Sequence, residues 1–218
     1  MSVSLLDELN RPVGKATKRM LPARSIAATL FFVLCHLFLP AGSRADSPTE
    51  QVRTTVDQVL AIVRSSNPKS KAQMEAQRAQ LLGVISPRFD FPEMAKRSLG
   101  RHWAGRTAEE QREFVKILAA LLGRSYADNI ESYAGQNVLY TREREEQNYA
   151  EVETKITSED RSPMSINYKL HSVDNKWRVY DLVIEDISVI NNYRSQFDRV
   201  IAKSSYVDLV RILKEKQS

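Results

Sequence analysis

The sequence predicts an α+β fold in which helical segments precede and follow one antiparallel sheet. Apolar residues recur at helical spacing between positions 48 and 133, and again from about position 191. From Gly135 they instead alternate with polar residues, which is the period of a strand with one buried face. This order of elements is typical of an α+β domain. We therefore expect helices in 46–134, a sheet in 135–189 and helices in 190–218.

Composition and charge limit the classes of function. The chain has 218 residues, and residues 46–218 are expected to form a single domain. It contains one Cys and three His, so a four-ligand zinc site would require all of them. The net charge is +5, but residues 1–45 hold six basic and two acidic side chains, and subtracting these from 32 and 27 leaves 26 and 25 in 46–218. A nearly neutral domain argues against nucleic acid as a partner, because such binding depends on many Lys and Arg contacts.

The first 45 residues have the organisation of a secretory signal peptide. Basic residues precede an apolar stretch of 14 residues, 26–39, which is shorter than the ~20 residues of a membrane span. Ser43 and Ala45 are small residues at the positions that signal peptidase reads, so we expect cleavage before Asp46. An uncleaved anchor is the alternative, and translation can start at Met20 instead of Met1. The one cysteine of the chain lies in this leader, so the mature chain has none. We expect the mature protein to be a monomer in the periplasm.

Capping signals predict the first two helices. Residues 47–50 form a capping box with proline at the first helical position, which opens a helix over 48–66. A second helix is expected over 70–85, between two proline-containing breaks. Its inward residues are expected to be Met74, Leu81, Leu82 and Ile85.

Two further helices are expected before the sheet. Asp90 caps a short helix that Gly100 can end with a positive φ, and Phe89 and Met94 have the spacing of a hydrophobic staple. A capping box at 107–110 opens a long helix that runs to about Tyr133.

The expected sheet contains three recognisable strands. Val152, Thr154 and Ile156 alternate with charged residues, and a second alternating strand begins at Met164. Asp174-Asn175 forms a turn into 176–187, which is apolar on both faces and is therefore expected to be central. Helical spacing resumes at about Asn191, with a break near Ser204-Ser205.

Motifs that resemble catalytic signatures are better explained by structure. Residues 100–107 nearly match a phosphate-binding loop, but a helix precedes them where that motif requires a strand. Residues 123–127 resemble a nucleophile elbow but lie inside the long helix. Asp181 and Glu185 are about 13 Å apart on a strand at ~3.3 Å per residue, so we expect a solvated or turn-capping acid cluster. His102 is expected to be a helix-end or packing residue, and His171 is expected to be exposed.

Residues in both halves resemble the signature of one known family. The first half contains Phe89-Asp90-Phe91, Met94, Leu99-Gly100, Trp103, Thr107, Gln111, Phe114 and Tyr126. The second half contains Val152, Thr154, Ile156, Trp177, Tyr180-Asp181, Ile187-Ser188 and the run Asn-Tyr-Arg-Ser-Gln-Phe at 192–197. Over nearly all of 50–216 the chain is similar to the MlaC family of periplasmic phospholipid-binding proteins, the toluene-tolerance auxiliary components of ABC transporters. The family usually has Gly where Asp186 stands, which puts the conformation of that turn in question.

The resemblance implies a nuclear-transport-factor-like sheet with helices around an apolar pocket. It implies a carrier with phospholipid as cargo and no cofactor, rather than an enzyme. Its partners would be an outer-membrane lipoprotein complex and an inner-membrane ABC transporter with an MCE-domain subunit. A hopanoid-associated carrier and an enzyme on the same cone-shaped fold are the alternatives.

If the apolar pocket that the resemblance implies is present, the apolar patterns predict ten lipid-binding residues. They belong to one apolar stripe of the long helix and to the apolar faces of two strands. If Ile166 faces the cavity, the Ile166→Trp substitution would displace lipid without destabilising the fold. The residues are Leu118, Leu121, Leu122, Tyr126, Val152, Ile156, Met164, Ile166, Tyr168 and Leu170.

Overall fold

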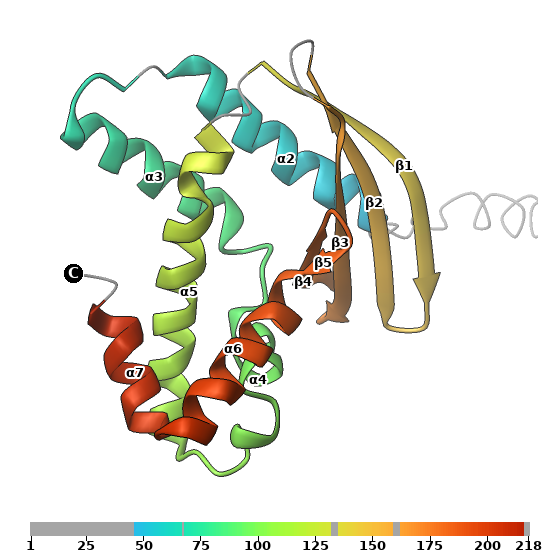
Figure 1. Cartoon of the computed structure of the whole chain (residues 1–218). Coiled ribbons are helices and arrows are strands. Elements are labelled where there is room, and N and C mark those ends of the chain that lie inside the picture. The colour runs from blue at the N-terminus through green and yellow to red at the C-terminus, as the bar shows by residue number, and fades with distance from the viewer. Residues whose placement is uncertain (1–45, 67, 132–134, 159–161, 216–218) are drawn as a thin grey trace, which may run out of the picture. The chain divides into compact units, whose positions relative to one another are not determined.

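Six α-helices and a five-stranded antiparallel sheet make up the described part of the computed structural model, residues 46–66, 68–131, 135–158 and 162–215 (Figure 1). The side chains of 126–131 are also outside this description. The elements in chain order are α2 (Pro48–Ser65), α3 (Lys71–Ile85), α4 (Phe91–Leu99), a 3₁₀ turn (Gly100–His102), α5 (Ala108–Glu131), β1 (Asn137–Glu146), β2 (Tyr149–Thr157), β3 (Met164–Val173), β4 (Lys176–Ile184), β5 (Ile187–Ser188), α6 (Val189–Lys203) and α7 (Tyr206–Glu215). The predicted α+β plan is confirmed.

Each strand pairs with its neighbour in sequence, in the order β1-β2-β3-β4-β5. The turn predicted at Asp174-Asn175 is present, and both residues have positive φ. The prediction of one central strand over 176–187 is wrong. The chain turns at Glu185 and Asp186, which have φ of 46° and 63°, and leaves only the two-residue β5 beyond β4. Asp186 therefore adopts the left-handed backbone region that glycine favours.

The inner face of the sheet is covered by α2, which lies beside β1 and β2 (Figure 1). Val52 of α2 is 2% exposed and packs with a cluster of buried sheet residues, which we call the sheet core. The sheet core also contains Ala150, Val152, Leu170, Trp177 and Val179. Burial of this face explains the period of two in β2 and β3.

A second cluster, the helix core, joins α4, α5, α6 and α7. Phe114 of α5 is fully buried at its centre, with its ring 5.7 Å from that of Phe197 in a T-shaped contact. Phe89 and Leu182 pack against both cores. These two residues therefore connect the helices to the sheet.

The predicted capping signals are confirmed at the N-termini of the first helices. Ser47 and Asp90 each accept a hydrogen bond from the backbone three residues later, as predicted. Ser70 caps α3 in the same way, which was not predicted from the sequence. At α5, Thr107 Oγ1 accepts from Glu110 N while a Glu110 carboxylate oxygen accepts from Thr107 N at 2.8 Å. The helix predicted from Asn191 begins two residues earlier, with Ser188 as its cap.

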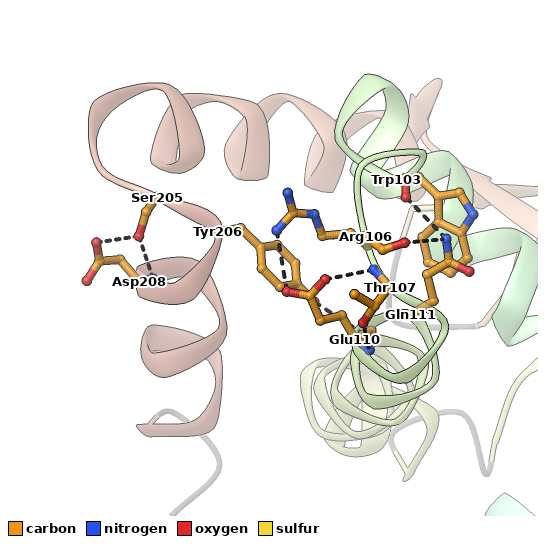
Figure 2. Close-up of polar contacts among 8 residues, drawn as sticks. All are labelled: Trp103, Arg106, Thr107, Glu110, Gln111, Ser205, Tyr206 and Asp208. Atoms are coloured by element: carbon orange, nitrogen blue, oxygen red, sulfur yellow. Dashed lines mark hydrogen bonds and ion pairs between the residues drawn. The ribbon is translucent and has the colours of Figure 1, made fainter.

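The start of α7 is fixed to α5 by Tyr206 (Figure 2). Its hydroxyl donates to the carbonyl of Glu110 at 3.3 Å, and the guanidinium of Arg106 lies 4.6 Å from its ring centroid. Burial raises the pKa of Tyr206 to about 12, so the hydroxyl remains a donor at neutral pH. Ser205 caps α7 and contacts Asp208 at 2.8 Å.

We expect Gly100→Ala to lower the free energy of unfolding by about 1–2 kcal/mol. Gly100 has a φ of +53°, and an added Cβ would lie 2.8 Å from Arg194 Nε. Urea denaturation of the purified variants measures the effect. Gly105→Ala is the control in the same connection, because the nearest atom to its added Cβ is 3.9 Å away. Equal stability of the two variants would contradict the prediction.

Candidate functional site: an apolar cavity between helices and sheet

A cavity of about 470 Å³ lies where α3, α4, α5, β4 and the first residue of α6 meet. This volume is within the range of small-molecule sites. The lining residues are Arg78, Leu81, Leu82, Ile85, Phe89, Phe91, Met94, Ala119, Ala120, Leu122, Gly123, Arg124, Leu182 and Val189.

One wall of the cavity is α3, whose apolar residues recur one turn apart. Leu81 is 3% exposed, whereas Leu82 is 43% exposed although it also lines the cavity. Leu82 was predicted to point inward, and it does line the cavity, but it is not buried. It lies at the open side, where solvent and the cavity meet.

The opposite wall is α5, and its small residues leave the space. Ala119, Ala120 and Gly123 line the cavity from consecutive turns of this helix. The two walls approach each other at Gly123, where Leu82 Cδ2 lies 3.5 Å from the place that an added Cβ would occupy. Larger side chains at these α5 positions would fill the cavity.

Aromatic and sulfur-containing side chains form the inner end. The rings of Phe89 and Phe91 stack with centroids 6.1 Å apart, and Met94 is 1% exposed. Leu182 of β4 and Val189 at the start of α6 complete the lining. The capped start of α4 positions this group, because Asp90 N donates to Val179 O of β4 at 2.8 Å.

The polar side chains among the lining residues are those of two arginines, Arg78 on α3 and Arg124 on α5. The remaining lining residues are apolar or glycine. An apolar space with cationic groups fits an amphiphile with a hydrocarbon part and an anionic part better than it fits a polar substrate.

Comparison with known proteins agrees with this chemistry. The family model described as MlaC protein matches residues 53–215, about three quarters of the chain. The chain belongs to the MlaC family. The family resemblance predicted from the sequence is thereby confirmed.

This MlaC family member is similar to two characterised relatives. One is the toluene tolerance protein ttg2D of Pseudomonas putida, 20% identical over 175 residues that cover 79% of this chain and 81% of the relative. The other is a solved structure of a phospholipid-binding protein from Ralstonia solanacearum in complex with a phospholipid. That structure is 27% identical with a TM-score of 0.71, over 79% of this chain and 97% of the other.

Of the ten residues predicted to bind lipid, Leu122 lines the cavity of this MlaC protein. Leu118 on the same helix is fully buried in the helix core, and Leu121 packs against that core. The side chain of Tyr126 lies outside the described residues.

The six predicted residues on the strands are not among the cavity lining. Val152 and Leu170 are fully buried in the sheet core, against which Tyr168 packs. Ile156 and Ile166 are buried, and Met164 is half-buried. The strand pattern identified a buried face correctly but did not show that α2 covers it.

The motifs that resemble catalytic signatures have structural roles. Thr107 caps α5 after the 3₁₀ turn, and 123–127 lie inside α5, as predicted. His102 Nε2 lies 2.7 Å from Asp198 Oδ1, and this hydrogen bond lowers the pKa of Asp198. Glu185 accepts hydrogen bonds from the backbone and hydroxyl of Ser165.

The prediction that His171 is exposed is wrong. Its side chain is 17% exposed, and Nε2 lies 2.9 Å from Asp90 Oδ2. Its ring also packs between those of Tyr149 and Tyr180, with centroids 6.5 Å and 5.6 Å away. His171 therefore joins β3 to the cap of α4, outside the cavity lining.

No group of three or more His, Cys, Asp or Glu among the described residues could hold a metal ion. Within the same part of the chain, no helix has the length and apolarity needed to cross a bilayer.

Proposed function

We propose that this protein is a periplasmic carrier that binds the acyl chains of a phospholipid in the cavity between α3 and α5. The observation that carries the proposal is the apolar cavity itself, lined by alkyl and aromatic side chains with arginine as its polar component. Membership of the MlaC family and the likeness to a phospholipid-bound structure support it.

The volume of the cavity suits part of a lipid. At about 470 Å³ it falls within the range of small-molecule sites, and we assign it to one acyl chain. The second chain of a diacyl lipid would extend through the open side beside Leu82. We propose that α3 is the wall that moves to admit it, since the most extensive packing of α3 is against α2.

Burial of acyl chains is what a carrier between two membranes must supply. Each methylene kept from water stabilises by ~0.8 kcal/mol, so two 16-carbon chains amount to roughly 25 kcal/mol. A free lipid cannot cross an aqueous compartment quickly against such a barrier. We propose that this protein exchanges lipid between an outer-membrane lipoprotein complex and an inner-membrane ABC transporter with an MCE-domain subunit, and that it does so as a binding protein without a catalytic step.

The test is to express the full chain, purify the protein from the periplasmic fraction and extract its bound lipid for mass spectrometry. We expect an N-terminus at Asp46 and co-purified diacyl phospholipid. A triterpenoid in the extract would instead support the hopanoid carrier. A lipid-free protein that also binds no added phospholipid, or an intact leader in the membrane fraction, would contradict the proposal.

A further inference from the structure

The two arginines of the cavity lie at the same helix crossing. Leu82 of α3 lies close to Gly123 of α5. Arg78 precedes Leu82 by one helical turn, and Arg124 follows Gly123 directly. Both arginines line the cavity, so two positive charges flank the point where its walls approach each other.

This crossing is also the open side of the cavity. Leu82 is 43% exposed and Arg124 is exposed, although both line the cavity. Met94, at the inner end, is 1% exposed. An amphiphile with its hydrocarbon towards Met94 would therefore place its headgroup between the arginines.

Guanidinium groups suit a phosphate better than other cations do. Their planar N–H donors bind two phosphate oxygens at once, and charge-assisted bonds of this kind are short and strong. Each arginine already takes part in an interaction within the protein. Since a guanidinium has five N–H donors, one arginine can bind a phosphate and a protein partner together.

We infer that Arg78 and Arg124 bind the phosphate of a lipid whose acyl chain fills the cavity, and that they select phosphate-bearing lipids over neutral lipids with the same chains. The inference rests on the proposed function, because it requires lipid in this cavity. A neutral polycyclic or glyceride ligand would bury apolar surface equally well but would give the two arginines no anion.

A matched pair of ligands tests the selection. Dioleoyl phosphatidic acid and dioleoylglycerol differ only in the phosphate, and each can displace a fluorescent fatty acyl probe from delipidated protein. We expect phosphatidic acid to bind at least tenfold more tightly. The double variant Arg78→Gln/Arg124→Gln should lose this preference, because its affinity for phosphatidic acid should fall by at least tenfold. Arg112→Gln, an exposed position of α5 outside the cavity lining, is the matched control and should keep the preference.

Each other outcome has a distinct meaning. Equal affinity of the unmodified protein for the two lipids would overturn this inference and leave the proposed function standing, whereas failure of both lipids to displace the probe would count against the proposed function. Inorganic phosphate that competes as strongly as phosphatidic acid would assign the arginines to free phosphate. Oleate that matches phosphatidic acid would show selection for any anion rather than for phosphate. If the double variant does not fold by circular dichroism, Arg124→Gln alone must lower the preference.

Discussion

The substitution Gly123→Trp is expected to abolish lipid retention while leaving the delipidated protein as stable as the unmodified chain. Gly123 lines the cavity from α5, and a Cβ added there meets only Leu82 Cδ2, at an ordinary contact distance of 3.5 Å. The indole would occupy the space assigned to an acyl chain. Tryptophan also has a better helix propensity than glycine, by about half a kcal/mol, which offsets part of any crowding. We expect at least a tenfold loss of affinity in the probe-displacement assay.

A glycine on the facing helix provides the matched control. Gly83 of α3 has nothing within 4 Å of an added Cβ and is not part of the cavity lining. Gly83→Trp makes the same chemical change in a helix but should retain lipid. Stability must be compared on delipidated samples, because a bound ligand raises apparent stability by mass action. Equal loss of lipid in both variants would show that the cavity is not the binding site.

The Ile166→Trp variant distinguishes lipid binding in the cavity from lipid binding on the strand face predicted from the sequence. Ile166 is 8% exposed on β3 and does not line the cavity. Overpacking of a buried position costs about 1–3 kcal/mol, so this variant should be destabilised and should keep its lipid. The sequence alone predicts the opposite result, since it places Ile166 in the pocket.

Local signals in the sequence predicted the helices well. Capping boxes and prolines act within a few residues, and the starts of α2, α3, α4 and α5 follow them. The strand β1 was not recognised individually. It is an edge strand with charged residues along its second half, and a solvated edge has no buried face to impose a period of two.

The position of the cavity could not be predicted from such local patterns. The alternation of apolar and polar residues along β3 indicates that one face of the strand is buried. The same alternation is expected whether a helix or a ligand covers that face. The covering element is α2, which contributes Val52 from more than a hundred residues earlier in the chain. A signal for the wall of this cavity was present in the small residues Ala119, Ala120 and Gly123 of the long helix, since small side chains at helical spacing leave room between packed elements.

Asp181→Ala is expected to cause a large loss of stability without affecting the cavity. Asp181 is 5% exposed, and its carboxylate accepts hydrogen bonds from Ser188 Oγ at 2.6 Å and Ile190 N at 3.0 Å. Of the two roles predicted for the acid cluster, solvated or turn-capping, the structure gives Asp181 the second. It fixes the N-terminus of α6 to β4, where a negative charge also interacts favourably with the helix dipole.

Alanine would leave the buried Ile190 N–H and the Ser188 hydroxyl without this acceptor, so the free energy of unfolding should fall by about 3 kcal/mol. Asparagine keeps one carbonyl oxygen for Ile190 N, and Asp181→Asn should cost only about 1 kcal/mol. Urea denaturation of the delipidated proteins measures both. Lipid binding should persist in both variants wherever they are folded, because Asp181 does not line the cavity. An equal loss of stability in the two variants would refute the capping role. Normal stability combined with loss of lipid would instead make Asp181 part of the binding site.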